Sequence, residues 1–402
     1  MMIKKTRLAI IVSHPIQHFV HFYRALAKVP GLELKVFYAT NIGVRPYFDQ
    51  DMGVEIAWNT NLLEGYDYVF LPEAEFIKKT GFSTVNNPSV TKALDEFVPD
   101  VIKIHGYGQI TLLRAFFWGL LRRIPVLLWS DSSLVYRRSN FKEFIKKFVL
   151  GIFFSRISAV LSPGDNNERY YRHYGVPSNK IYRCAFTVDE DMFSDALAKR
   201  LVIRRHLRNK YGLSCDAFVF LFVGKLIPLK RPKDILVALS LLKERHFHGV
   251  DIQVVFAGDG VLRKELEQYV LDWRLPVSFA GFVNVDLLPS VYAMADALIF
   301  SSDREAYGLS AREAICVGLP LIVSDQIGCV GRTDAAREGE NAIVYRSGDT
   351  DSLASAITRL TTDSETYRQM SEASLRVASE LNIDASIRGI TRAIDAVISR
   401  TL

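Results

Sequence analysis

Two glutamates flank a short glycine-containing loop in the second half of the chain. Glu305 and Glu313 are separated by Ala-Tyr-Gly-Leu-Ser-Ala-Arg. Gly308 frees the backbone, so the N–H groups of Leu309 and Ser310 can point at an anion with a helix dipole behind them. Glu305 can accept hydrogen bonds from sugar hydroxyls, and Glu313, one turn inside the helix, from a ribose diol. The alternative is two ordinary surface glutamates, which the dipole favours near a helix start.

Two lysines follow the apolar run 218–223. In the segment Gly-Lys-Leu-Ile-Pro-Leu-Lys, Gly224 allows close approach of the backbone to a ligand. Lys225 and Lys230 can neutralise a diphosphate as point charges, and Pro232 is well placed at a helix start. A basic turn without a ligand is the alternative interpretation.

Two glycines, Gly258 and Gly260, follow the next apolar run, 252–257. They permit a tight turn beside a ligand, and they equally suit a plain strand-to-helix turn. Neither this loop nor the segment His-Gly-Tyr-Gly at 105–108 completes GxGxxG, so a dinucleotide-binding fingerprint is missing.

Four residues of the first half are further candidates for ligand binding. His105 follows the strand-like run 101–104 and Asp131 follows the run 126–129, which are the strand ends where parallel α/β sheets bind ligands. His14 and Gln17 lie in Ser-His-Pro-Ile-Gln-His at 13–18, where Pro15 is expected to start a helix. A structural role is the alternative for a lone histidine.

Apolar β-branched runs that alternate with helical patterns must position these loops. The strands expected from these runs are Leu8–Val12, Leu34–Tyr38, Asp67–Leu71, Val101–Ile104, Val126–Trp129, Phe218–Val223, Ile252–Ala257, Val277–Ala280, Ala297–Phe300 and Leu319–Val323. The helices expected between them include Pro232–Arg245, Val261–Leu271 and Ser310–Val317. Near-continuous apolar strands predict an α/β fold with parallel sheets covered on both faces, in two doubly wound sets.

A chain of 402 residues is long enough for two domains. The strand-like segment Ile181–Phe186 gives way to the charged helical stretch Ala198–Tyr211 before a new sheet begins. We assign residues 1–190 to the first domain and residues 191–382 to the second. The last helix, Ile383–Ser399, carries an apolar stripe, and residues 383–402 are expected to pack back on the first domain.

Composition excludes several classes of protein. The chain is 49% hydrophobic and 23% charged, which argues against disorder, collagen and coiled coil. It has no apolar window of 18 residues, and we expect neither a signal peptide nor a membrane span. Its four cysteines lack CxxC spacing, which argues against zinc and against a disulfide framework. A cytoplasmic, reduced location is predicted.

Positive charge is concentrated in one region. Residues 101–183 carry 14 Lys and Arg against 4 Asp and Glu, a surplus that attracts phosphates such as lipid headgroups. The segment Phe141–Phe154 places Phe141, Phe144, Ile145, Phe148 and Ile152 on one stripe beside Lys142, Lys146 and Lys147. This helix either packs its stripe on the sheet or lies in a membrane interface. We expect loose, salt-sensitive association with the inner membrane face. No nucleic-acid module is recognisable.

The second half resembles glycosyltransferases of the GT-B fold, retaining family 4, over roughly residues 210–350. The resemblance rests on Gly-Lys-x4-Lys, Gly-Asp-Gly, Gly-Phe-Val at 281–283, Glu-x7-Glu and Glu-Asn-Ala at 340–342, in this order. It implies two Rossmann-like domains that face a central cleft, the first for the acceptor and the second for a nucleotide-sugar donor. The first half resembles the family more loosely, through the His-Pro-Ile-Gln start.

The resemblance also implies roles for individual residues. Lys225 and Lys230 would hold the donor diphosphate, Glu305 the donor sugar and Glu313 the ribose. The remaining donor-binding candidates are Gly224, Gly258, Gly260, Ala280, Gly281, Phe282, Tyr307, Gly308, Leu309 and Ser310, with Ala280 to Phe282 lining the base through backbone groups. His105 matches an active-site histidine, and His14, Gln17 and Asp131 would lie on the acceptor side.

The chain departs from the family pattern at three places. Lys225 stands where the family usually has Arg, which keeps the charge and loses the bidentate fork. Arg231 replaces the usual glycine after the second lysine, a departure that bears on the shape of the loop. Phe186-Thr187 replaces the Asn-Gly that usually precedes the Val-Asp found here at 188–189, which puts any hinge contact carried over at that place in doubt.

No metal is expected. His14, His18 and His21 mimic metal-ligand spacing, but a helix start at Pro15 would leave His14 in a loop. Asp349-Thr-Asp351 matches a DxD string, which binds a metal–nucleotide complex in other glycosyltransferases. It precedes the helical pattern 352–360, so an N-cap role suffices. Lysines and a helix N-terminus would supply the electrostatic stabilisation instead.

The resulting prediction is a metal-independent, retaining hexosyltransferase-type enzyme without a cofactor. It would transfer a sugar from a nucleotide diphosphate sugar, UDP by default, to a glycan or lipid-linked acceptor. The alternatives are a sugar-nucleotide epimerase or phosphorylase of the same architecture, or a catalytically silent nucleotide-sugar-binding scaffold.

Overall fold

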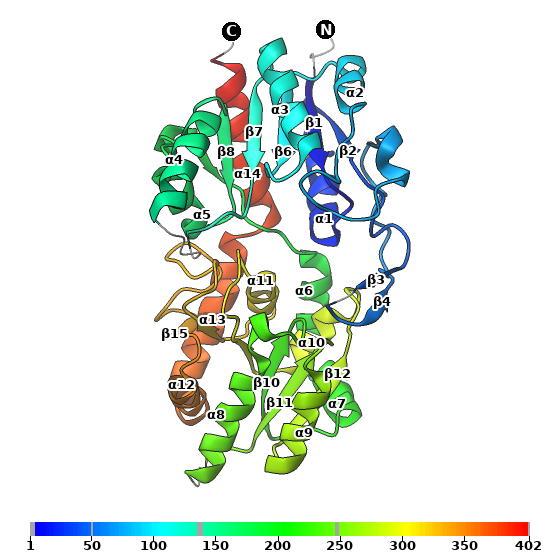
Figure 1. Ribbon diagram of the computed structural model, residues 1–402. Helices are drawn as coiled ribbons and strands as arrows, with labels where there is room; N and C mark the ends of the chain where they lie inside the picture. Colours follow the sequence, from blue (N-terminus) through cyan, green and yellow to red (C-terminus); the bar gives the residue numbers. More distant parts are fainter. Residues whose placement is uncertain (1–4, 50, 135–139, 246–248, 401–402) are drawn as a thin grey trace. The chain divides into compact units, whose positions relative to one another are not determined.

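The computed structural model describes residues 5–49, 51–134, 140–245 and 249–400. The chain divides into two compact units (Figure 1). Unit 1 contains Met1–Tyr47, Thr60–Val188 and Asn382–Leu402, and unit 2 contains Phe48–Asn59 and Asp189–Leu381. Each unit has a parallel sheet covered by helices, which confirms the α/β fold of two Rossmann-like domains.

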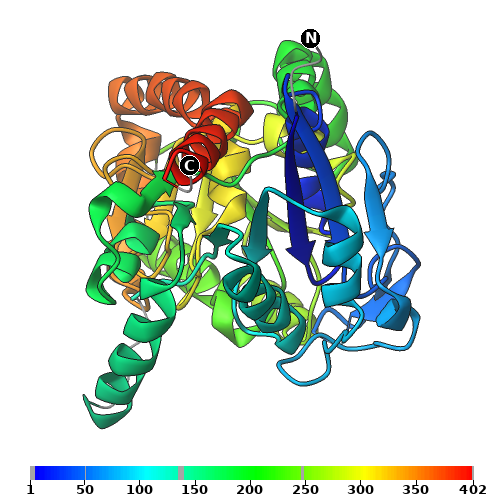
Figure 2. The ribbon, with the colours of Figure 1, turned by 90° about the horizontal axis from the view of Figure 1, so that it is seen from above.

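Unit 1 is built on a seven-stranded sheet of order β5-β2-β1-β6-β7-β8-β9, in which neighbouring strands pair in parallel. Its strands are β1 (Thr6–Val12), β2 (Leu32–Tyr38), β5 (Tyr68–Phe70), β6 (Val101–His105), β7 (Val126–Trp129), β8 (Ala159–Ser162) and β9 (Ile181–Arg183). Its α-helices are α1 (Gln17–Leu26), α2 (Val90–Phe97), α3 (Ile110–Arg122), α4 (Asn140–Ser155), α5 (Asp165–His173) and α14 (Ile383–Ile398). In the view from above, α4 is the teal helix that projects outward (Figure 2).

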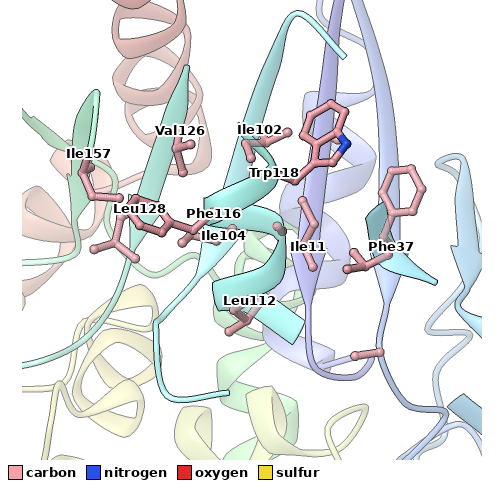
Figure 3. Close-up of a cluster of buried hydrophobic side chains, with 14 of the residues drawn as sticks. Ile11, Phe37, Ile102, Ile104, Leu112, Phe116, Trp118, Val126, Leu128 and Ile157 are labelled. Carbon is pink, nitrogen blue, oxygen red and sulfur yellow. The ribbon is translucent and has the colours of Figure 1, made fainter. Parts of the chain in front are cut away.

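The core of unit 1 lies between the sheet and α3. Leu112, Phe116 and Trp118 of α3 meet apolar side chains of β1, β2, β6 and β7 (Figure 3). Strands with both faces covered are apolar at nearly every position, as β7 is in Val-Leu-Leu-Trp, where all four residues are buried.

The last helix packs on unit 1. The Ser386 hydroxyl of α14 donates to the carbonyl of Ala185 at 3.1 Å. At Gly389 a Cβ atom would lie 1.8 Å from the carbonyl oxygen of Arg183, so only glycine allows this close approach of α14 to the end of β9.

Unit 2 is built on a six-stranded parallel sheet of order β12-β11-β10-β13-β14-β15. Its strands are β10 (Phe218–Val223), β11 (Ile252–Ala257), β12 (Val277–Gly281), β13 (Ala297–Phe300), β14 (Leu321–Ser324) and β15 (Ala342–Tyr345). Its α-helices are α6 (Glu190–Ala198), α7 (Arg200–Lys210), α8 (Pro232–Glu244), α9 (Arg263–Trp273), α10 (Leu288–Met294), α11 (Leu309–Cys316), α12 (Thr350–Thr362) and α13 (Ser364–Glu380).

Several details differ from the sequence-based expectations. Residues 48–59 were assigned to the first domain, but they belong to unit 2 because their side chains bind there, as described below. They contain β4 (Val54–Ile56) and the last two residues of β3 (Tyr47–Asp49), which pair in a small two-stranded sheet. Pro15 does not start α1, which begins at Gln17 after the extended residue Ile16. The expected strand Leu319–Val323 is shifted to β14.

Candidate functional site

The strand order of unit 2 reverses between β10 and β13. β11 and β12 follow β10 on one side, and β14 and β15 follow β13 on the other. Ligands of doubly wound folds bind at the carboxyl ends of the strands on either side of such a reversal. The loops that follow β10 and β13, residues 224–231 and 301–308, therefore mark the candidate site of this unit.

Backbone hydrogen bonds tie these two loops together. The N–H of Asp303 donates to the carbonyl of Leu229 at 2.9 Å. The Ser301 hydroxyl lies 2.9 Å from the carbonyl oxygen of Lys230 and 3.1 Å from that of Arg231. The two loops form one fixed surface, on which the lysine-bearing loop is held against the glutamate-bearing loop.

Lys230 and Glu305 form an ion pair across this surface. Both side chains are largely buried, with exposed fractions of 20% and 23%. The structure thus brings together two residues that the sequence analysis assigned separately, one to a diphosphate and one to a sugar. In this structure the ammonium group of Lys230 is bound by the carboxylate of Glu305.

Lys225 is also bound by carboxylates. Its Nζ lies 2.9 Å from Asp49 Oδ2 and 3.0 Å from Asp51 Oδ2, both in the segment 48–59 of unit 2. Burial alone would lower the pKa of Lys225, but the hydrogen bonds to Asp49 and Asp51 outweigh it and the pKa is raised. Lys225 therefore remains an ammonium ion, as phosphate binding requires. Neither aspartate is among the candidates from the sequence, because their spacing in Asp-Gln-Asp gives no signal of this contact.

Arg231 keeps a backbone conformation that glycine prefers. Its φ of 48° and ψ of 44° lie in the left-handed region, which costs a non-glycine residue roughly 1–2 kcal/mol. Its guanidinium donates to both carboxylate oxygens of Asp234, at 2.6 and 3.1 Å, and this anchors the residue at the start of α8. Replacement of the usual glycine has therefore not forced the loop out of the left-handed conformation.

The glycines of the Gly-Asp-Gly loop serve close backbone packing. At Gly258 a Cβ atom would lie 1.9 Å from the carbonyl oxygen of Gly224, and at Gly260 one would lie 2.6 Å from that of Leu226. The N–H of Gly258 also donates to the carbonyl of Gly281 at 2.8 Å. The loop after β11 thus supports the lysine-bearing loop, and packing alone explains why it contains glycine.

Helix α11 begins at the switch point. Gly308 precedes it with a φ of 113°, and a Cβ atom there would lie 2.9 Å from side-chain atoms of Phe300 and Ile327. The hydroxyl of Ser310 donates to the carbonyl of Val223 at 3.2 Å, which holds the first turn of the helix at the end of β10. Because Gly308 has no side chain to cap the helix, the first N–H groups, including those of Leu309 and Ser310, suit an anion.

Glu313 lies one turn further along α11 and is partly buried. Burial raises the pKa of its carboxyl group to about 7, although a hydrogen bond from the Tyr292 hydroxyl, 2.7 Å away, acts in the opposite direction. The side chain therefore changes charge near neutral pH.

The remaining donor-side candidates lie at one edge of the sheet and in the core. Ala280 and Gly281 end β12, and Ala280 and Phe282 line a cavity of about 420 Å³ together with side chains of α7 and α10. The ring of Trp58 lies 6.3 Å from that of Phe282. Tyr307 is only 2% exposed, so its side chain packs in the core.

Unit 1 has a second strand reversal, between β1 and β6. His14 follows β1, Gln17 is the first residue of α1, and His105 ends β6. Burial lowers the pKa of His14 to about 4 and that of His105 well below its usual value, so both imidazoles are neutral at pH 7. Asp131 follows β7, one strand further along the sheet.

The described residues contain no group of three or more side chains suited to hold a metal ion. Asp349 is the N-cap of α12 and accepts from the N–H of Ser352 at 2.9 Å, while Asp351 pairs with Arg245. The DxD string therefore has a structural explanation. In the described part of the chain, no helix is long and apolar enough to cross a membrane.

Residues 203–377 match the family described as Glycosyl transferases group 1. The alpha-D-kanosaminyltransferase of Streptomyces kanamyceticus is 29% identical over 220 residues, which cover 54% of this chain and 54% of the relative. The D-inositol 3-phosphate glycosyltransferase of Thermomonospora curvata is 30% identical over 188 residues, which cover 45% of this chain and 43% of the relative. The chain thus matches about half the length of these curated relatives.

Solved structures match over nearly the whole chain. The structure of Anabaena HepE in complex with UDP has a TM-score of 0.71 at 16% identity and covers 98% of this chain and 100% of HepE. HepE has also been solved with UDP-glucose, with a TM-score of 0.69 at 15% identity and coverage of 98% and 100%. The chain therefore has the GT-B fold of glycosyltransferases, and its residues 203–377 match the glycosyl transferases group 1 family.

Proposed function

We propose that the protein is a retaining glycosyltransferase of the hexosyltransferase type that uses a nucleotide diphosphate sugar, with UDP as the default nucleotide. The observation that carries the proposal is the joined surface at the switch point of unit 2. There Lys230, Glu305 and the N-terminus of α11 are held together by the bonds between the two loops. The similarity to HepE, which was solved with UDP and with UDP-glucose, supports the choice of nucleotide.

Donor binding would replace the ion pair between Lys230 and Glu305 by two interactions, one of each residue with the donor. The diphosphate replaces the carboxylate of Glu305 at the ammonium group of Lys230, because a phosphate carries more charge and more acceptor oxygens. Glu305 is then free to accept hydrogen bonds from hydroxyls of the donor sugar. The ion pair between Lys230 and Glu305 thus holds both groups close to their working positions.

The reaction would depend on stabilisation of the leaving group. As the bond to the sugar breaks, negative charge accumulates on the departing diphosphate, and Lys230, Lys225 and the first N–H groups of α11 stabilise it. This set of groups supplies the positive charge without a metal ion. The leaving phosphate takes the proton of the acceptor hydroxyl on the same face of the sugar, so that neither Glu305 nor His105 acts as a covalent nucleophile.

The acceptor would be a glycan or a lipid-linked sugar of a polysaccharide or glycoconjugate pathway, at an anionic membrane surface. Helix α4 faces the core of unit 1 with Leu150 and Phe154, which are buried. The described side chains of its apolar stripe lie on another face of the helix and are exposed. Phe144 is 72% exposed and Phe148 67%. Ile145, Val149 and Ile152 are exposed beside them. Phe141 and Lys142 lie outside the described side chains.

Basic groups accompany these exposed apolar side chains. Lys147 and Arg156 of this region are exposed, whereas Lys146 lies over the rings of Tyr170 and Tyr174. Helix α3 packs beside α4 through Phe116 and Phe153 and exposes Phe117 and Leu121. It ends at Arg122, which pairs with Asp95, and the exposed Arg123 follows it. Apolar side chains bordered by Lys and Arg suit an interface with anionic lipid.

Two measurements test the proposed activity. Thermal-shift screening against nucleotides and nucleotide sugars should give stabilisation by a nucleoside diphosphate, about 2.7 kcal/mol at 100 times its Kd. Release of the nucleoside diphosphate should then require an acceptor. Turnover of the nucleotide sugar without acceptor would favour an epimerase. Binding without turnover, together with normal cellular function of the Glu305→Ala variant, would favour a catalytically silent scaffold that binds nucleotide sugars.

A further inference from the structure

A lysine lies in the middle of the core of unit 1. Lys103 is 0% exposed, on β6, between β1 and β7. Lysine is almost never fully buried unless it is paired, because transfer of its charge out of water is costly. His105 lies two residues further on the same strand, so the two side chains emerge from the same face of the sheet.

The hydrogen-bond partner of Lys103 is a histidine. Lys103 Nζ lies 2.6 Å from His105 Nε2, and the described residues place no carboxylate within ion-pair distance of this lysine. The amine is surrounded by rings, whose centroids lie 5.5 Å away for Phe22 and 5.9 Å away for Trp129. A cation over aromatic faces gains part of the stabilisation that a carboxylate would otherwise give.

The chemistry of the two groups decides the direction of this hydrogen bond. A lysine ammonium group can only donate. Burial lowers the pKa of Lys103 to about 8, which still leaves it charged at pH 7, and burial beside Lys103 and His18 lowers the pKa of His105 well below its usual value. The shared proton therefore stays on Lys103, and His105 Nε2 accepts.

A hydroxyl group lies beside the same nitrogen. The hydroxyl of Tyr23, from α1, lies 3.2 Å from His105 Nε2. Burial raises the pKa of Tyr23 well above its usual value, so its hydroxyl stays neutral at pH 7. Because Lys103 donates to Nε2, the single proton of the neutral imidazole must be on Nδ1, and the Tyr23 hydroxyl, which can donate or accept, then directs its proton toward Nε2.

We propose that Lys103 is a positioning residue that fixes His105 as the neutral tautomer with its proton on Nδ1. His105 then offers a hydrogen-bond donor, not an acceptor, to a ligand at the carboxyl end of β6. It cannot serve as a general base through either nitrogen, because Nε2 is occupied and Nδ1 is protonated. The tautomer follows from unit 1 alone, and its use on substrate hydroxyls or phosphate oxygens rests on the function proposed above.

Nuclear magnetic resonance of the full chain tests the tautomer directly. In protein labelled with ¹⁵N-histidine at pH 7, His105, assigned with His105→Gln, should show a protonated Nδ1 and an unprotonated Nε2. In Lys103→Met the Nε2 signal should move toward the protonated type. Tyr23→Phe, which leaves Lys103 in place, should keep the Nδ1–H form. A protonated Nε2 in the unaltered protein, or no change in Lys103→Met, would overturn the proposal.

Measurements of Tm and of kcat distinguish a positioning role of Lys103 from a purely structural one. Met fills the space of the lysine without a buried charge, so Lys103→Met should fold with an unchanged or higher Tm. If His105 acts on substrate as proposed, kcat should fall about tenfold, as expected for one lost hydrogen bond, with an unchanged KM for the donor. Lys92→Met, on the exposed face of α2, is the control. If the protein proves inactive with every nucleotide sugar, the ¹⁵N result still decides the tautomer.

Discussion

Lys225 is held by Asp49, a residue 176 positions earlier in the chain. The two atoms Nζ and Oδ2 are 2.9 Å apart, and Asp49 is only 14% exposed. Burial would raise the pKa of Asp49, but the hydrogen bonds from Lys225 and from the backbone N–H groups of Met52 and Asp51 lower it overall. The segment 48–59 thus presents a carboxylate to a lysine that the proposed function assigns to a diphosphate.

Removal of this carboxylate should strengthen nucleotide binding. In Asp49→Asn the diphosphate no longer competes with an ionised side chain for Lys225, so we expect the Kd for UDP to fall three- to tenfold, or about 0.7–1.4 kcal/mol. Asp195→Asn, which removes an exposed partner of Lys199 in unit 2, is the matched control. Isothermal titration calorimetry measures both. A weaker or unchanged affinity in Asp49→Asn would show that Asp49 supports the site instead of competing for it.

Substitution of Lys230 and substitution of Glu305, the partners of the ion pair at the switch point, should affect different steps. Lys230→Ala removes a charge that contacts the diphosphate, so UDP affinity should fall 10- to 100-fold. Glu305→Ala should leave UDP affinity unchanged or slightly increased, because the competing carboxylate is lost, and should lower kcat instead. Binding by calorimetry and turnover by nucleotide release separate the two effects. Unchanged UDP affinity in Lys230→Ala would refute the assignment.

Much of unit 2 could be predicted from sequence because its strands are continuous apolar runs. The predicted bounds of β10, β11 and β13 coincide with those observed. β8 and β15, each of four residues, were missed, although β7 and β13 of the same length were predicted.

The contacts that depend on tertiary structure could not be predicted. The pairing of Lys225 with Asp49 depends on where the segment 48–59 packs, and no local pattern encodes it. The surroundings of Lys103 could likewise not be predicted. The apolar run Val101–Ile104 indicates a strand covered on both faces, but only the assembled fold shows that aromatic rings of α1 lie beside the lysine.

Nucleotide-sugar binding should depend on pH through Glu313. Its carboxyl group has a pKa of about 7, and the ionised form is the better acceptor for ribose hydroxyls. If only that form binds, affinity for a UDP-sugar should rise about tenfold from pH 6 to pH 8. The phosphodiester groups of this ligand do not titrate in that range. Glu313→Gln should bind more weakly at pH 8 and show a flat profile. If the affinity of Glu313→Gln depended on pH as steeply as that of the unaltered protein, Glu313 would be excluded as the source of the pH dependence.

The contribution of Glu313 to the stability of the folded protein should fall as pH rises, whereas its contribution to binding should rise. The folded-state pKa of Glu313 lies above the ordinary value of 4.5, so its contribution is fully present below pH 4.5 and is lost as pH rises through 7. Glu313→Gln should therefore raise Tm at pH 8 relative to the unaltered protein and change it little at pH 4.5. Thermal unfolding followed by circular dichroism at the two pH values measures this difference. An equal change of Tm at both pH values would contradict the raised pKa.

Activity should survive removal of divalent metal. The proposed stabilisation of the diphosphate comes from Lys225, Lys230 and the N-terminus of α11, and Asp349 is engaged as a helix cap. Nucleotide release measured after dialysis against EDTA should match that of untreated protein. A complete loss that magnesium restores would mean that a metal ion shares this task.

Membrane association should require both the apolar and the basic side chains of α4. Sedimentation with anionic vesicles at low salt should carry the protein down, while neutral vesicles should not, since each basic residue near anionic lipid contributes about 1 kcal/mol. High salt should release it. The double variant Phe144→Ser with Phe148→Ser should lower partitioning about tenfold through lost apolar burial. Leu271→Ser, on the exposed face of α9, is the matched control. Equal, negligible binding to both vesicle types at low salt would leave the exposed stripe without a lipid partner, and the acceptor would then be sought in solution.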